Sequence, residues 1–230
     1  VMSDFFSKLE ELRNSADAND RRAFYFMERA YNFAKGNRAL GLGVLGWHSY
    51  LQSKMIAFES LEANKINTEI FRLIQNRSYA ASKTLAQELG EPELLQGYGR
   101  RNSTLNAIAP TTSSSFILGQ VSQSIEPIWS NCYVKDIDKM KVTIKNPSLE
   151  KILEEKSKNT QETWESIRVK DGSVQHLDFL SEAEKDVFKT FCEIDQEAVI
   201  AQAASRQHFI DQSQSLNLMV NPQTPTKEIN

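Results

Sequence analysis

The stretch RNSTLNAIAPTTSSSFIL, residues 101–118, decides how the fold of this chain is read. Residues 104–109 form a short, mostly apolar run of a length suited to a buried strand, and Pro110 ends it. Hydroxyl side chains fill residues 111–115, and an apolar helix is expected to begin near Phe116. The order of strand, hydroxyl-rich turn and helix indicates an α/β element at this point of the chain.

The hydroxyl-rich turn has a definite chemical use. The first backbone N–H groups of a helix lack intrahelical partners, and the helix dipole leaves a partial positive charge there, so the position favours an anion. The hydroxyls of Thr111, Ser113 and Ser114 would add neutral hydrogen-bond donors for a phosphate group. The alternative is that one of these residues only caps the helix while the others fill a polar loop.

Helical periodicity dominates the chain on both sides of this turn. The apolar spacing of residues 62–89 predicts a long helix, which Gly90 and Pro92 end. The strand-like composition of residues 131–144 predicts a hairpin with a polar tip at residues 136–138. The remaining predicted helices cover residues 20–35, 148–155, 160–170, 181–191 and 195–204, and a last strand is expected at residues 213–220. A helical pattern at the first residues and a proline-punctuated tail lead us to expect an excerpt of a longer polypeptide.

The glycines Gly41, Gly43 and Gly46 match the pattern Gly-x-Gly-x-x-Gly. A dinucleotide site would need a strand before this pattern, whereas the preceding residues 31–37 read as the end of a helix. Close backbone packing at a turn and a helix start is therefore the preferred interpretation.

Composition excludes several classes of protein. The formal charge of -3 over 230 residues provides no positive field for nucleic acid, so no nucleic-acid partner is expected. The longest nearly apolar stretch, residues 39–47, is too short to cross a bilayer, so we expect no membrane association and a cytoplasmic location. Two cysteines, Cys132 and Cys192, fit a reducing compartment and most simply act as small hydrophobic residues. The histidines His48, His176 and His208 lack ligand spacing, so no metal site is predicted.

Four segments occur in an order that matches a known family. They are NRALGLGV at residues 37–44, RNSTLNAIAPTTSSS at 101–115, SIEP at 124–127 and HFIDQS at 208–213. Together they resemble successive landmarks of the class I ribonucleotide reductase large subunit, and the resemblance covers nearly the whole chain.

The resemblance implies a specific site. The family's diphosphate-binding loop falls on Pro110, Thr111, Thr112, Ser113 and Ser114, where backbone amides and hydroxyls hold the substrate's phosphates. Some relatives carry an acidic residue in place of Thr112, so no proton-handling role is carried over to this position. The glycine cluster would then belong to the barrel scaffold.

The resemblance also implies a fold and a reaction. The whole of residues 1–230 would form the C-terminal half of a ten-stranded α/β barrel, with 1–95 mainly helical and 96–230 mixed. The parent enzyme would reduce ribonucleoside diphosphates by thiyl-radical chemistry. No Asn-x-Cys-x-Glu finger motif occurs, so we assign no catalytic residue and expect the chain alone to be inactive. No cofactor is expected in this segment, because the radical would come from a metal-containing small subunit.

The implied partners are the substrate, the remainder of the large subunit, the small subunit and a second large subunit in a dimer. Two other hypotheses remain open at this point. One is a non-enzymatic helical module that docks to a partner through its amphipathic faces. The other is a fragment of a cobalamin-dependent reductase, which would need no small metal-containing subunit.

Overall fold

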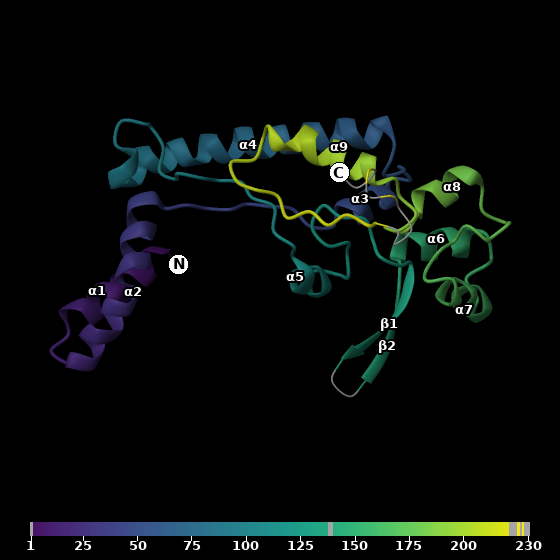
Figure 1. Ribbon diagram of the computed structural model, residues 1–230, viewed down its shortest axis with the longest axis horizontal. Helices are drawn as coiled ribbons and strands as arrows, with labels where there is room; N and C mark the ends of the chain where they lie inside the picture. The colour runs from purple at the N-terminus through teal and green to yellow at the C-terminus, as the bar shows by residue number, and fades with distance from the viewer. Residues whose placement is uncertain (1, 138–139, 221–224, 226, 228–230) are drawn as a thin grey trace. The chain divides into compact units, whose positions relative to one another are not determined.

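The computed structural model describes residues 2–137, 140–220, 225 and 227, and it divides into two compact units. Unit 1 comprises residues 1–42, 73–107 and 209–212, and unit 2 comprises residues 43–72, 108–208 and 213–230. Both are helix-rich (Figure 1). In chain order the elements are α1 (Met2–Asn14), α2 (Ala18–Asn37), α3 (Trp47–Ser53), α4 (Leu61–Leu89), η1 (Glu93–Leu95), α5 (Thr112–Ile117), β1 (Cys132–Ile137), β2 (Met140–Lys145), α6 (Pro147–Glu155), α7 (Gln161–Val169), α8 (Glu182–Val187) and α9 (Gln196–Gln207).

Unit 1 is built on the helical hairpin of α1 and α2. Asp17 caps α2 by accepting a hydrogen bond from the amide of Asn19. Phe6 and Phe24 both meet the edge of the Tyr31 ring and form a small aromatic core. This core holds the two helices against each other, and they lie side by side in Figure 1.

Two extended segments run side by side in unit 1. The amide of Leu42 donates to the carbonyl of Leu105 over 2.7 Å, and the amide of Ala107 donates back to Leu42 over 3.0 Å. A methyl group on Gly41 would lie 3.1 Å from the Cβ of Ala107, so this close approach favours glycine. The glycine cluster follows a helix, since α2 ends at Asn37, and the preference for packing over dinucleotide binding agrees with this geometry.

Asp211 connects two segments of unit 1 by hydrogen bonds. Its carboxylate accepts hydrogen bonds from the Tyr79 hydroxyl over 2.6 Å and from the amides of Leu105 and Asn106 over 2.6 and 3.1 Å. Burial alone would raise the pKa of the Asp211 carboxyl, but these hydrogen bonds and the nearby Arg100 together hold it below its ordinary value. The segment HFIDQS at residues 208–213 therefore has a structural function through this aspartate.

Two apolar clusters form the core of unit 2. One gathers Leu149, Leu153, Ile167 and Phe188 from α6, α7 and the end of α8. The other joins α3, the first part of α4 and α9 around Leu51, Phe58 and Phe191. Helical spacing turns Leu51, Leu149 and Leu153 inward, whereas Phe58 and Phe191 enter the core from turns. Burial of their apolar area stabilises the arrangement.

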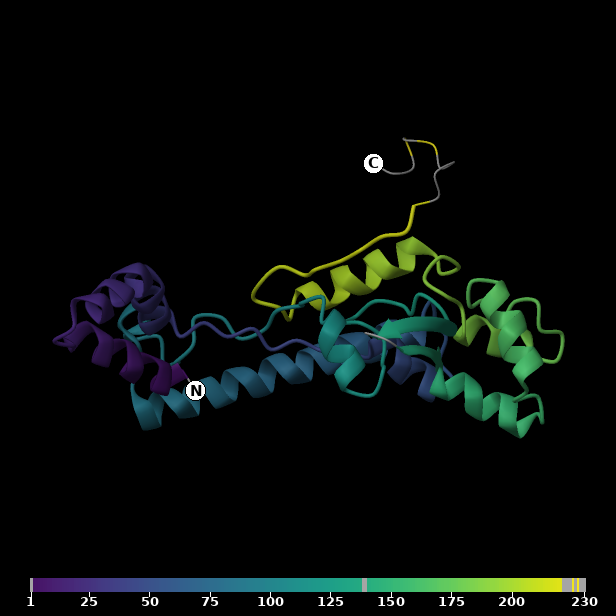
Figure 2. The same cartoon turned by 90° about the horizontal axis from the view of Figure 1, so that it is seen from below.

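Arg206 lies inside unit 2 with none of its surface exposed. Its Nε donates to Oε1 of Gln214 over 2.7 Å and its Nη1 donates to Oδ1 of Asn67 over 2.8 Å. Burial lowers the pKa of Arg206 to about 9. Through these contacts the guanidinium joins α4, α9 and the segment at 213–220, which runs beside α9 in Figure 2.

The predicted hairpin is confirmed, with β1 and β2 antiparallel and Cys132 opposite Lys145. Of its predicted tip at residues 136–138, the first two belong to β1, and residue 138 lies outside the described residues. The predictions of helices at 20–35, 62–89, 148–155, 160–170 and 195–204 are confirmed, with ends that differ by at most three residues. The predicted helix at 181–191 is shorter, because α8 ends at Val187.

The predictions of strands at residues 104–109 and 213–220 are wrong. Within the described residues the first has only isolated parallel bridges, Leu42 with Asn106 and Ile108 with Gln214, and the second shares the latter bridge. Residues of strand-like composition become a strand only where a neighbour pairs with several of them in succession, and no such neighbour is found in the described part of the chain.

Candidate functional site

The hydroxyl-rich turn forms a sharp bend followed directly by α5. Thr111 has φ 50° and ψ 25°, the left-handed conformation, and stands immediately before the first residue of the helix. The expected helix start at Phe116 is wrong, because α5 begins at Thr112. The reason is that the turn at Thr111 lets the amide of Ser115 bond the Thr111 carbonyl over 2.9 Å, which closes the first helical turn early.

The early start changes what the hydroxyl residues can present. Thr112, Ser113 and Ser114 now occupy the first turn of α5, and their amides come before the first amide with an intrahelical acceptor, that of Ser115. Pro110, Thr112, Ser113 and Ser114 are all exposed, and Thr111 is half-buried. The turn thus offers a group of backbone donors and hydroxyls to solvent.

Ser115 is different from its neighbours. It is buried, with 1% of its surface exposed, and its hydroxyl donates to the carbonyl of Thr112 over 2.8 Å. It stabilises the first turn from inside. The exposed hydroxyls of Ser113 and Ser114 form no hydrogen bond with any other described residue, so they are available to a ligand.

The segment after α5 holds the turn in place. Thr111 Oγ1 accepts a hydrogen bond from the amide of Ser124 over 2.9 Å, and Thr112 Oγ1 donates to Oε1 of Gln123 over 3.2 Å. The amide of Ser215 donates to the carbonyl of Ile108 over 3.0 Å and fixes the approach to the turn. Sequence reasoning did not assign Gln123 or Ser124 to the site, since a contact across about a dozen residues of loop leaves no periodic signal.

Glu126 anchors the same segment from the other side. Its carboxylate is 4% exposed and accepts hydrogen bonds from the amide and the side-chain Nδ2 of Asn217, over 3.1 and 2.8 Å. The landmark SIEP therefore contributes Ser124 to the turn and Glu126 to the segment at 213–220. The sequence identified SIEP as a family landmark, but it predicted no role for Ser124 or Glu126.

The residues of the turn carry no charged side chain of their own. The Nζ of Lys135 lies over the ring of Phe116 in α5, just after the turn. The site could therefore hold an anion by helix-end amides and neutral hydroxyls, which is the arrangement that favours a phosphate group at a helix N-terminus.

Across residues 2–137 and 140–220, no group of three or more His, Cys, Asp or Glu side chains could hold a metal ion. Among the helices of the described residues, none has the length and apolar character that a bilayer crossing requires. His48 is completely buried, and its Nδ1 accepts a hydrogen bond from the amide of Ile128 over 3.0 Å. Burial lowers the pKa of His48 to about 3.

Fold and turn together define a helix-rich chain with exposed backbone amides and hydroxyls at the start of a short helix. The family described as "Ribonucleotide reductase, barrel domain" matches residues 12–95 and 92–230. The chain belongs to this family.

Individual relatives agree with the family match. The chain is 42% identical over 233 residues to the ribonucleoside-diphosphate reductase large subunit of Invertebrate iridescent virus 6, covering 99% of this chain and 24% of that protein. It is 44% identical over 199 residues to the corresponding subunit of Invertebrate iridescent virus 3, covering 85% of this chain and 32% of that protein. The chain thus spans about a quarter to a third of these relatives.

A solved structure has the same arrangement. The class Id ribonucleotide reductase alpha subunit of Actinobacillus ureae superposes with a TM-score of 0.86 at 52% identity, over 99% of this chain and 40% of that one. The resemblance to class I large subunits is confirmed by these matches.

Proposed function

We propose that the turn at Pro110, Thr111, Thr112, Ser113 and Ser114 binds the diphosphate group of a ribonucleoside diphosphate. The observation that carries the proposal is the exposed first turn of α5, with free amides at Thr112, Ser113 and Ser114. Each amide can donate to a phosphate oxygen, and the hydroxyls of Ser113 and Ser114 add two more donors. Charge-assisted hydrogen bonds of this kind are about twice as strong as neutral ones.

The complete protein would then be a ribonucleoside-diphosphate reductase. In this proposal the chain supplies the C-terminal half of a ten-stranded barrel, and the thiyl-forming and reducing cysteines lie elsewhere in the large subunit. The surroundings of Cys132 support that division. Cys132 is buried and burial raises the pKa of its thiol, which disfavours the reactive thiolate.

The partners follow from the same proposal. They are the nucleotide substrate, the remainder of the large subunit, a second large subunit, and a metal-containing small subunit that supplies the radical. The small subunit would carry the metal chemistry, and the residues of this chain would bind and orient the diphosphate. A cytoplasmic location stays a prediction, as do the proposed division at residues 95 and 96 and the absence of a nucleic-acid partner.

The proposal is tested by the thermal stability of the chain in inorganic diphosphate. A ligand that binds the folded state stabilises it by RT ln(1 + [L]/Kd), about 2.7 kcal/mol at a concentration of 100 times Kd. The melting temperature should therefore rise in saturating inorganic diphosphate and stay unchanged in sodium chloride of equal ionic strength. An equal melting temperature in both solutions would reject the site.

A further inference from the structure

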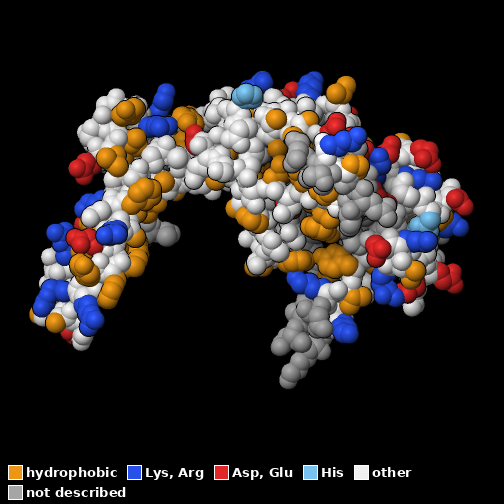
Figure 3. All heavy atoms as spheres, in the orientation of Figure 1, with side chains coloured by type: hydrophobic (Ala, Val, Ile, Leu, Met, Phe, Trp, Pro, Cys, Tyr) orange, Lys and Arg blue, Asp and Glu red, His pale blue; other side chains and the backbone are white. Residues whose placement is uncertain are grey.

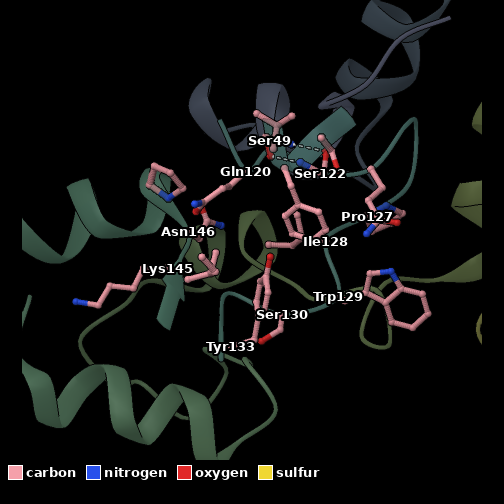
Figure 4. Close-up of a pocket in the computed structure, with 16 residues that line it drawn as sticks. Ser49, Gln120, Ser122, Pro127, Ile128, Trp129, Ser130, Tyr133, Lys145 and Asn146 are labelled. Atoms are coloured by element: carbon pink, nitrogen blue, oxygen red, sulfur yellow. Dashed lines mark hydrogen bonds between the residues drawn. The ribbon is translucent and has the colours of Figure 1, made fainter. Parts of the chain in front are cut away.

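Apolar side chains gather in two different forms on this protein. In unit 2 they line a pocket of about 370 Å³ between α5 and the β1–β2 hairpin, whose walls include Pro127, Ile128 and Tyr133 (Figure 4). In unit 1 they lie on the convex surface of α2, and hydrophobic side chains are visible over the α1–α2 hairpin in Figure 3. A pocket encloses a small molecule, whereas an apolar helix face packs against another protein element.

Helix α2 is apolar on two opposite faces. On one face Phe24 and Tyr31 are buried in the small aromatic core with α1. On the other face Phe26 and Phe33 are 72% and 64% exposed, so no element among the described residues covers them. A helix with apolar residues on opposite sides is expected between two layers of protein. The first layer is α1, and the second face of α2 is open.

The open face has the spacing of a coiled-coil seam. Ala23, Phe26, Ala30 and Phe33 follow one another at intervals of three, four and three residues, and all four are exposed. Residues at this spacing line up along one side of a helix. These four residues are named the α2 stripe. Because alanine and phenylalanine alternate in it, each ring stands beside a space that a partner side chain can fill.

One edge of the α2 stripe carries positive charge. Arg22 and Arg29 each precede an alanine of the stripe and are seven residues apart, so both lie along the same edge. None of the ion pairs in the described part of the chain includes either of them. Met27 and Ala34, which follow the two phenylalanines, leave the opposite edge uncharged. A complementary partner is therefore acidic along one edge only.

A second copy of this chain does not satisfy both the α2 stripe and its charged edge. In an antiparallel pair of α2 helices, each phenylalanine can face an alanine of the other copy, but the two arginine edges then meet. In a parallel pair the arginine edges separate, but phenylalanine faces phenylalanine and alanine faces alanine, which leaves gaps in the packing. The occupant that fits is a different helix.

We propose that the α2 stripe packs against a helix from the part of the large subunit that lies outside this chain. This chain spans between 24% and 40% of the relatives named above, so most of such a subunit is available to supply that helix. The fitting helix has apolar residues at the same three- and four-residue spacing, and Asp or Glu along the edge that meets Arg22 and Arg29. The inference rests on the proposal that the complete protein is a longer reductase subunit, but it does not involve the diphosphate turn.

The test compares the labelling of a cysteine on the α2 stripe in this chain and in the complete large subunit. Ala30→Cys adds a thiol at an exposed position of the stripe, and Asn32→Cys, the matched control, adds one at an exposed position of α2 outside it. The rate of reaction with N-ethylmaleimide is measured by mass spectrometry of the peptide that contains the new thiol. Protection is the ratio of the rate in this chain to the rate in the complete subunit.

The two positions should differ in protection. The thiol at residue 30 should be protected at least about tenfold, because its reaction in the complete subunit requires local opening of the contact. The thiol at residue 32 should react at the same rate in both proteins.

Charge reversal tests the acidic edge of the partner. Arg29→Glu, added to Ala30→Cys, should lower the protection roughly 2- to 5-fold, as expected for the loss of an exposed ion pair. Lys83→Glu, at an exposed position of α4, is the matched control and should leave the protection unchanged.

The proposal is overturned if the thiol at residue 30 reacts equally fast in both proteins, or if it is already slow in this chain. A rate in this chain that falls with protein concentration would show a second copy on the α2 stripe, and a slow rate at every concentration would show that the chain covers the stripe itself. Equal protection with and without Arg29→Glu would reject the acidic partner. Failure of inorganic diphosphate to stabilise the chain, with the protection intact, would reject only the function proposed above.

Discussion

The hydroxyl of Thr111 accepts a hydrogen bond from the amide of Ser124 over 2.9 Å, across a loop that contains the whole of α5. Thr111 is also one of the residues that adopt a left-handed conformation, with φ 50°. The same residue therefore sets the bend before the helix and joins it to the returning segment. The bend at Thr111 sets the direction of the first amides of α5. The hydrogen bond between Thr111 and Ser124 therefore helps to determine the shape of the proposed anion site.

Replacing Thr111 by valine should test this contact. Thr111→Val keeps a β-branched side chain of similar size and removes the acceptor, so the amide of Ser124 loses its partner. We expect a loss of about 1 kcal/mol in the free energy of unfolding, together with weaker binding of inorganic diphosphate. Thr143→Val, on the exposed part of β2, is the matched control and should change neither quantity. Equal stability of the two variants would show that the contact contributes nothing.

Removing a hydroxyl from the first turn of α5 should weaken anion binding directly. Ser113→Ala and Ser114→Ala each delete one donor to a charged ligand, and a hydrogen bond to a charged group contributes about 1.5 to 3 kcal/mol. The dissociation constant for inorganic diphosphate, measured by calorimetry, should rise by roughly 10- to 150-fold for each change. Ser3→Ala in the exposed start of α1 serves as control. Unchanged constants in both turn variants would exclude these hydroxyls from the site.

His48 should make the stability of the chain depend on pH. Burial lowers its pKa from 6.5 to about 3, so the folded chain keeps the imidazole neutral where the unfolded chain takes up a proton. The contribution of neutral His48 to the free energy of unfolding is therefore fully present above pH 6.5. It decreases by about 1.4 kcal/mol for each pH unit below that value, until the pH reaches the folded pKa.

Unfolding in denaturant at pH 7 and pH 5 should show this loss. His48→Asn can still accept the amide of Ile128 but does not titrate, so its decrease between the two pH values should be smaller by about 2 kcal/mol. Equal decreases in both proteins would contradict a neutral, buried His48.

Gly172 should tolerate no side chain. It has φ +87°, and an added Cβ would lie 2.6 Å from the Cβ of Ser130 and 2.7 Å from the amide nitrogen of Asn131. Gly172→Ala must therefore move the backbone at the start of β1, as well as adopt an unfavourable left-handed conformation. Gly90→Ala is a close control, since Gly90 has φ +79° with nothing within 4 Å of the added Cβ.

The two glycine variants should differ in unfolding free energy. Gly90→Ala should lose only the backbone strain, about 1 to 2 kcal/mol, whereas Gly172→Ala should lose roughly 2 kcal/mol more because of the additional clash. Denaturant unfolding of both variants measures the difference. A similar loss in each would mean that the segment around Ser130 can shift freely.

Local patterns in the sequence predicted most of the helices. The apolar spacing of α4, with Gly90 and Pro92 after it, is a signal contained within the helix itself, because its hydrogen bonds join residues four apart. The hairpin of β1 and β2 was predictable for a related reason, since its two strands are neighbours in the chain. The hydroxyl turn was also visible, as a run of donors followed by an apolar stretch.

Contacts between distant residues were decided by the tertiary structure. The pairing of Ile108 with Gln214 is a single bridge rather than a strand pair, and the buried Arg206 of α9 donates a hydrogen bond to Asn67 of α4, 139 residues earlier in the chain. The pocket that contains Tyr133 is assembled from segments between residues 49 and 147. No periodic pattern in the sequence predicts which of these residues are in contact.

The amino-acid sequence by itself determined most of the helices, the hairpin, the donors of the hydroxyl-rich turn and the family landmarks, because each depends on residues close together along the chain. The tertiary structure decided that α5 starts at Thr112, that Ser124 and Gln123 hold the turn, and that Tyr133 lines a pocket. The physical reason is that these features depend on hydrogen bonds and burial between segments that come together only when the chain is folded.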